Sequence, residues 1–277
     1  MKTLTIKIGT FLWGLTALLS ATSCTQTSEN ARISFDSYSA ASTYSLIGSA
    51  SDFNRPTDVI CCDSVSLVLP LTLDKTDVNR VRDLILEEAF GQKAMSVEKA
   101  MHTWLDNAAK EHSYKTVMVP YSEISNAVGI NVVRGFVVYL SPKVMVYCVN
   151  HNTMMPGAAN GLSTRKYVNY LLEDGGKILT LQDIFTPEGL AELPSLIASQ
   201  AEKYIEYAGN VSITETPRDD SFYLSSEDEI VFHYDPMEVG PHSLGDVEIA
   251  FYPAELVHQM TPAAIKLFGL EDILRDF

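Results

Sequence analysis

Positively charged residues are scarce in this sequence. Its 277 residues include 20 Lys and Arg against 35 Asp and Glu, which gives a net charge of -15. A chain without a basic stripe does not neutralise phosphate groups, so the composition argues against nucleic-acid binding and against electrostatic docking on an anionic membrane. The same excess of acid favours cationic partners.

Motifs that would indicate a particular chemistry are also missing. The sequence contains no Gly-x-Ser-x-Gly, His-Glu-x-x-His, phosphate-binding loop or Gly-x-Gly-x-x-Gly motif. Its four cysteines form no Cys-x-x-Cys pair, which excludes a zinc ribbon and a thioredoxin-type site. We therefore expect no enzymatic activity, no cofactor and no bound metal.

The apolar run from Ile8 to Leu19 is too short to span a bilayer comfortably. It follows two lysines and precedes small residues and Cys24, which is the layout of a secretory signal peptide over residues 1–23. A cysteine after small residues resembles the bacterial lipobox, although Ala21 stands where that motif usually has Leu. We predict that Cys24 is acylated and that residues 24–36 form a polar tether; an ordinary signal peptide with an incidental cysteine is the alternative.

Cleavage would leave residues 24–277 with 18 basic and 35 acidic residues, lipid-anchored to a bacterial membrane and facing the periplasm. Cys61, Cys62 and Cys148 then remain in an oxidising compartment. Neighbouring residues of a strand point to opposite faces, so only one of Cys61 and Cys62 could meet Cys148. The alternative is that all three are small buried hydrophobic residues.

Hydrophobic periodicity predicts an α+β fold with antiparallel sheets and packed helices, in two modules at residues 37–149 and 150–277. Helical spacing predicts one helix from a cap at Thr76 to Gly91 and another from Ser96. Period-two alternation and turn residues predict the strands. They are expected between residues 44 and 73 and at 131–140, 143–150, 165–172, 177–181, 222–224, 230–234 and 247–252.

Two prolines shape the helices expected in the second module. A helical turn begins at Pro187, and because proline is disfavoured inside a helix we expect a break at Pro194 and a new helix from there to Tyr207. A last short helix is expected from Pro262 to Gly269.

Three stretches of the second module carry a family resemblance. They are the loop from Pro156 to Gly161, the segment from Tyr167 to Phe185 and the segment from Ile230 to Leu256. In this order and spacing they resemble the RsiV-type family, the extracytoplasmic domain of lysozyme-sensing anti-sigma factors. That family is also related to the amino-terminal region of the peptidoglycan deacetylase PdaC.

The resemblance, which covers residues 150–258, implies a binding module and not an enzyme. The chain lacks the Asp-Asp and His-x3-His metal ligands of the deacetylase's catalytic domain. With a cleaved signal we also expect neither the cytoplasmic sigma-binding segment nor the membrane span of the sensor. Asn160 replaces the His of the family's Gly-Gly-Ala-His-Gly loop, which argues against a metal or proton-transfer role at that loop.

Polar residues are densest in the pattern His-x-Asp-x2-Glu-x3-His between His233 and His242. Such residue types bind divalent cations or perform acid–base chemistry. On a strand His233 and Asp235 share one face, whereas residues 236–241 predict a bend whose carboxylates bond turn amides. We expect a structural bend, pinned by prolines and by glycines that include Gly245.

The sequence therefore predicts a lipid-anchored, non-catalytic binding protein of the cell envelope. The expected ligand is lysozyme, another basic envelope-active protein, or peptidoglycan. An envelope glycan hydrolase or esterase that uses Asp235, Glu238 and His242 is the alternative, and it requires these three side chains to converge in an open cleft. The candidate ligand-binding residues are Gly157, Asn160, Tyr234, Asp235, Glu238 and His242.

Acylation of Cys24 can be tested by metabolic labelling with an alkyne fatty acid. We expect the wild-type protein to be labelled and Cys24→Ser to be unlabelled, because the thiol is the attachment point. Cys62→Ser is the matched control and should label like the wild type. A wild-type protein that takes up no label would reject this prediction.

Overall fold

The structure is a computed structural model. It describes residues 33–50, 56–73, 76–91, 95–113, 118–119, 128–155, 160–204 and 211–273. The predicted signal peptide, Cys24 and Gly157 lie outside these residues.

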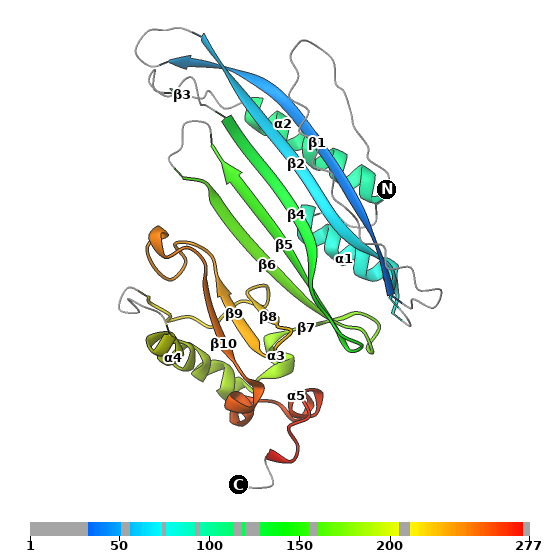
Figure 1. Cartoon of the computed structure of the whole chain (residues 1–277), viewed down its shortest axis with the longest axis vertical. Coiled ribbons are helices and arrows are strands. Elements are labelled where there is room, and N and C mark those ends of the chain that lie inside the picture. Colours follow the sequence, from blue (N-terminus) through cyan, green and yellow to red (C-terminus); the bar gives the residue numbers. More distant parts are fainter. Residues whose placement is uncertain are drawn as a thin grey trace.

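Seven strands form one long sheet in the order β3-β1-β2-β4-β5-β6-β7 (Figure 1). They are β1 (Ile33–Ala50), β2 (Pro56–Leu73), β3 (Met118–Val119), β4 (Val128–Leu140), β5 (Val144–Met154), β6 (Leu162–Leu171) and β7 (Lys177–Leu179). A second sheet has the order β10-β9-β8. Its strands are β8 (Phe222–Leu224), β9 (Ile230–Tyr234) and β10 (Val247–Phe251).

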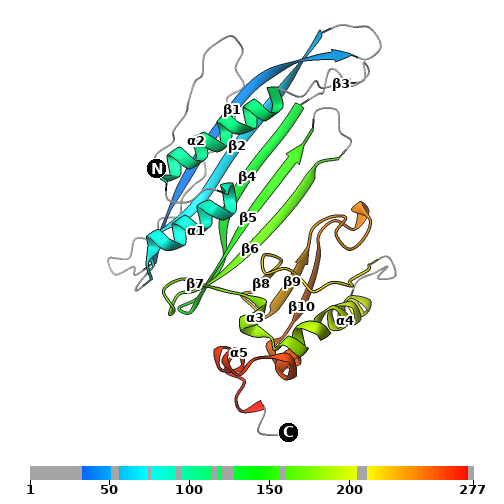
Figure 2. The same cartoon turned by 180° about the vertical axis from the view of Figure 1, so that it is seen from behind.

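Helices cover the long sheet on one face and accompany the small sheet at one end (Figure 2). They are α1 (Val78–Phe90), α2 (Val97–Ser113), α3 (Leu181–Ile184), α4 (Pro187–Tyr204) and α5 (Pro262–Leu267), with 3-10 turns η3 (His242–Leu244) and η4 (Pro253–Gln259). No helix among the described residues is both long and apolar enough to cross a membrane.

The α+β class is confirmed, but the long sheet is mixed and not wholly antiparallel. β2 runs parallel to β4, and β1 runs parallel to β3. After β2 the chain passes through α1 and α2 before it returns, and such a long crossover brings the next strand back parallel. Alternation within a strand does not encode this direction, because parallel and antiparallel strands share the same period of two.

β5 is buried on both of its faces. Met145, Tyr147 and Val149 pack into the core beneath α1 and α2. The alternate residues Val144, Val146 and Cys148 pack into a second core with the small sheet, α3 and α4. The expected module boundary between residues 149 and 150 falls inside β5, which pairs with β4 and β6 on its two sides.

Asn169 of β6 joins the two sheets from a fully buried position. Its side-chain Nδ2 donates to the carbonyl oxygen of Phe222 at 3.0 Å, and its Oδ1 accepts from the amide of Leu224 at 3.0 Å. The side chain thus pairs with β8 as a neighbouring strand would. The backbone amide of Tyr167 adds a bond of 2.8 Å to the carbonyl of Asp220.

The helices of the first module lie close to the predicted positions, with one correction at the start of α1. Asp77, not Thr76, is the capping residue, and its carboxylate accepts from the amides of Asn79 and Arg80. The Thr76 hydroxyl instead donates to the Leu172 carbonyl at 2.7 Å in the interior. Threonine and aspartate both favour the N-cap position of a helix. Because the Thr76 hydroxyl bonds to the distant Leu172 carbonyl, Asp77 caps α1.

The predicted helix break at Pro194 is wrong, because α4 continues through this residue. Proline removes the bond to the carbonyl four residues earlier, which is that of Leu190. The hydroxyl of Thr216, distant in sequence, lies 3.5 Å from this carbonyl oxygen and donates to it. This tertiary hydrogen bond therefore offsets part of the free-energy cost of a proline inside the helix.

No disulfide joins the three cysteines that the structure describes, so neither possible pairing with Cys148 forms. Cys61 and Cys148 are buried and Cys62 is half-buried. The alternative of small buried side chains fits Cys61 and Cys148. Burial raises the pKa of Cys148 to about 12, which keeps this thiol protonated.

We expect Asn169→Ala to lower the free energy of unfolding by about 2–4 kcal/mol, because it leaves a buried carbonyl and a buried amide without partners. Exposed Asn160 provides the control, and Asn160→Ala should change stability by less than about 0.5 kcal/mol. Urea unfolding of both variants measures the difference. Equal midpoints would show that Asn169 does not join the sheets.

Candidate functional site

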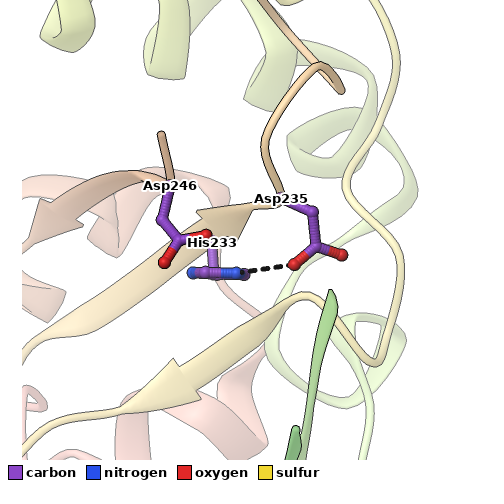
Figure 3. A group of neighbouring side chains, drawn as sticks. All are labelled: His233, Asp235 and Asp246. Carbon is purple, nitrogen blue, oxygen red and sulfur yellow. Dashed lines mark hydrogen bonds and ion pairs between the residues drawn. The ribbon is translucent and has the colours of Figure 1, made fainter. Parts of the chain in front are cut away.

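A polar cluster lies where β6 meets the small sheet, with His233 of β9 at its centre (Figure 3). The imidazole is 1% exposed. Its Nε2 lies 3.1 Å from Asp235 Oδ1, and its Nδ1 lies 3.3 Å from Glu248 Oε1 on the neighbouring strand β10. A ring with both nitrogens directed at carboxylates is suited to the imidazolium form.

Opposing effects set the charge of His233. Burial alone would lower the pKa of the imidazole, but the hydrogen bonds and negative charges of Asp235 and Glu248 raise it to about 9. The bond from His233 in turn lowers the pKa of Glu248. The cluster therefore holds a positively charged histidine between Asp235 and Glu248 at neutral pH.

Asp235 and Asp246 connect this charge to the long sheet. Asp235 Oδ1 also accepts from the backbone amide of Arg165 in β6 at 2.8 Å. The Arg165 guanidinium forms an ion pair of 2.8 Å with Asp246 Oδ2. Arg165 of β6 thus contacts both ends of the segment between β9 and β10. These contacts join the small sheet to the long sheet.

Aromatic rings cover the inner side of the imidazole. Tyr167 of β6 stands edge-on to His233 with ring centres 5.2 Å apart, and it stacks on Tyr223 with ring centres 4.4 Å apart. Burial raises the pKa of both tyrosines. Tyr167 thus packs directly against the buried imidazole, while the Glu248 carboxylate remains partly exposed.

The three residues of the hydrolase alternative are held in different ways. Glu238 forms an ion pair of 2.5 Å with Arg218, and its other oxygen accepts from the Asp235 amide at 3.0 Å. His242 is exposed at the start of η3, and no hydrogen bond between described residues joins it to Asp235 or Glu238. Asp235 and Glu238 therefore serve the bend, as expected for turn carboxylates.

The remaining candidate residues are not gathered around this cluster. Tyr234 is buried in the core shared with the small sheet, and burial raises the pKa of its phenol. Asn160 is exposed just before β6. Gly245 has a φ of 68° and a ψ of -148°, a conformation that belongs almost only to glycine, so its place in the bend is explained by backbone geometry.

His233, Asp235 and Asp246 also offer three possible metal-ligand atoms, all within 4.8 Å of one another. Both nitrogens of His233 are already directed at carboxylates, and the Arg165 guanidinium lies 2.8 Å from Asp246. Arg165 therefore supplies the positive charge that a cation would bring to Asp246. The cluster joins the two sheets, and we call it the charged clamp. Its members are His233, Asp235, Asp246, Glu248 and Arg165.

Sequence reasoning missed Arg165, Arg218, Asp246 and Glu248 as members of the cluster. One signal was available for Glu248: if β9 and β10 form a hairpin, the register pairs Glu248 with His233. No comparable signal marks Arg165, because it is about seventy residues away in sequence from Asp235.

The geometry defines a two-sheet α+β protein with a charged clamp at the junction of the sheets. Residues 182–251 match the family described as "Protein of unknown function (DUF3298)". This segment includes α4, the small sheet and most of the clamp. A comparison with curated proteins gave no match.

Two solved structures are similar to most of this chain. A member of the DUF3298 family from Bacteroides fragilis NCTC 9343 has 18% identity and a TM-score of 0.60, over 86% of this chain and 96% of that one. A DUF3298 family protein from Pseudomonas aeruginosa PAO1 has 16% identity and a TM-score of 0.49, over 83% and 96%. The first of these likenesses shows a shared fold.

The raised pKa of His233 predicts a pH dependence of stability. The unfolded imidazole loses its proton near pH 6.5 and the folded one near pH 9, so this contribution is complete below pH 6.5 and disappears as the pH rises to 9. We expect a loss on the order of 2–3 kcal/mol over this range. Urea midpoints at pH 6, 7.5 and 9 measure it, and His233→Gln should flatten the slope. A wild-type slope equal to that of the variant would contradict the assignment.

Proposed function

We propose that this chain is a non-catalytic binding protein of the bacterial cell envelope, anchored through Cys24, and that its ligand is a cationic protein such as lysozyme. The distribution of charge carries this proposal. Residues 173–273 contain twenty acidic and four basic residues, so they hold the whole negative surplus of a chain with a net charge of -15. The rest of the chain is nearly neutral.

This acidic part coincides with the small sheet and the helices around it. Glu188 and Glu202 are exposed on α4, and Glu227 and Asp228 are exposed in the turn between β8 and β9. Concentrated charge of one sign speeds the encounter with a partner of opposite charge. The resemblance to RsiV-type domains of lysozyme sensors lies over the same residues and supports the same class of ligand.

The arrangement of the polar cluster favours binding over hydrolysis. Asp235 is occupied by His233 and the Arg165 amide, and Glu238 is occupied by Arg218. A general acid or base must be able to reach a substrate proton. Carboxylates that already stabilise a bend are poorly suited to that role, so the hydrolase alternative has weaker support.

Binding kinetics on immobilised protein test the cationic ligand, with lysozyme as the probe. We expect association to slow by about an order of magnitude between low salt and 0.5 M salt while dissociation changes little, because screening acts mainly on the encounter. An unrelated protein of equal negative charge should bind less. Binding no stronger than that control, or none at low salt, would reject this ligand.

Paired charge variants locate the contact. Glu188→Gln with Glu202→Gln removes two charges from α4 in the acidic part. Glu98→Gln with Asp106→Asn removes two exposed charges from α2 and serves as the matched control. The first pair should slow association more than the second, and equal effects would mean that charge acts without regard to position.

Peptidoglycan is a second candidate ligand, favoured by the face of the long sheet opposite α1 and α2. Arg134 of β4 is exposed there, and none of the ion pairs between described residues includes it. The cross-strand register places it between Ser66 of β2 and Asn150 of β5. Hydroxyl, amide and guanidinium groups are donors that suit sugars and carboxylates.

Co-sedimentation with purified peptidoglycan tests this second ligand. We expect wild-type protein to pellet and Arg134→Ala to remain in solution, because the guanidinium is the charged donor on this face. Arg80 is exposed on α1, and Arg80→Ala removes the same charge elsewhere and should pellet like the wild type. A wild-type protein that stays in solution would exclude this ligand.

A further inference from the structure

Exposed apolar side chains gather at one end of the long sheet. Leu71 lies near the end of β2, and Phe136, Val138 and Leu140 lie in the last five residues of β4; all four are between 37% and 42% exposed. They make up half of the large hydrophobic residues that are exposed in the described part of the chain. We call these four residues the apolar tip. Exposed apolar groups that gather in this way commonly mark a contact surface.

Two of these side chains are directed outward by irregularities in the strands. β1 and β2 change register between Ser34 and Phe35, which leaves Leu71 as the unpaired extra residue. β4 and β5 change register between Val137 and Tyr139, which leaves Val138 in the same position. A bulge redirects a side chain and commonly serves a purpose, so both bulges present an apolar group that regular pairing would have placed differently.

The sheet also splits at this end. β2 and β4 pair only as far as Leu67 and Gly135, and the last residues of both strands continue without pairing to each other. Phe136 and Leu140 therefore lie on a strand segment that pairs only with β5. Phe136 pairs with Cys148 and lies on the same face of the sheet as Arg134. Leu140 pairs with Met145 and lies on the face covered by α1 and α2. The tip is consequently a feature of the strand ends that includes both faces of the sheet.

The chain enters the described structure at the same end. Ile33 opens β1 and pairs with Leu73, two residues beyond Leu71 (Figure 1). Cys24 precedes Ile33 by nine residues, which span at most about 30 Å when fully extended. An acyl group on Cys24 would therefore hold this end of the sheet close to the bilayer.

We propose that the apolar tip rests against the surface of the membrane that holds the Cys24 anchor. This inference rests on the proposed anchoring at Cys24. Neighbouring turns carry charges of both signs, with Lys143 beside β5 and Glu173 and Asp174 after β6, so the contact is apolar and not electrostatic. The lipid supplies affinity for the membrane and the tip supplies orientation, so that the acidic part of the protein is presented in a defined direction.

Fluorescence quenching by brominated lipids tests the tip. Trp104 is the one tryptophan of residues 24–277, so Trp104→Phe provides a background for single reporters. In this background Val138→Trp reports on the tip, and Thr43→Trp, exposed on β1 toward the other end of the sheet, is the control. The acylated proteins are placed in vesicles of phosphatidylcholine and phosphatidylethanolamine.

We expect the Val138→Trp reporter to be quenched roughly two-fold or more beyond the Thr43→Trp reporter, because an apolar side chain at the interface lies near the acyl boundary. Quenching should persist in 0.5 M salt. Circular dichroism shows whether the Val138→Trp variant is folded. If it is not, Leu71→Trp serves as a second reporter on the tip. If the proteins float with the vesicles but the two reporters are quenched equally, the proposed membrane contact of the tip is wrong and the anchor stands. If the proteins do not float with the vesicles, both the proposed anchor and the proposed contact of the tip are wrong.

Discussion

The burial of β5 on both faces is the constraint on which the other parts of this structure depend. Its side chains alternate between two cores, with Tyr147 in one and Val146 in the other. Full burial of one such side chain contributes about 1.5–3 kcal/mol, so exposing either face would forfeit several such contributions. The core with the small sheet and the core beneath α1 and α2 therefore share one strand, and neither is complete without it.

The polar contacts at the junction follow from this shared strand. With β5 in place, β6 runs beside the small sheet, and Asn169 and Arg165 meet partners about fifty to eighty residues away. Burying a charged imidazole is costly unless each polar atom is paired. His233 meets this condition because Asp235 and Glu248 take both of its nitrogens. The first two residues of the densest polar pattern, His233 and Asp235, thus take part in joining the two sheets.

The proposed roles divide the remaining surface of the molecule. Negative charge belongs to the part after β6, exposed apolar groups belong to the ends of β2 and β4, and a neutral polar face surrounds Arg134. A lipid-anchored binding protein needs a side for the membrane and another for its ligand. The apolar side chains of the tip and the exposed acidic residues of α4 and of the turn between β8 and β9 can supply these two sides.

Local patterns predicted much of the fold. The helices near Val78 and Val97 and the strands of the small sheet lie close to their expected positions, because amphipathic spacing and turn residues act over a few neighbours. The prediction that His233 and Asp235 share a face and that the following carboxylates serve a bend also agrees with their contacts. The break at Pro194 was wrong because the compensating hydroxyl of Thr216 is not a sequence neighbour.

The sequence by itself determined the α+β class, the acidic character, the scarcity of catalytic motifs and the positions of most helices and strands. Only the tertiary structure decided the parallel pairing of β2 and β4, the joint use of β5 by two cores and the partners of His233. The physical reason is range: propensity and periodicity depend on residues within a few positions, whereas Arg165 and Asp246 become neighbours only after both sheets have formed. For the same reason, no single segment of the sequence contains all the residues of the charged clamp.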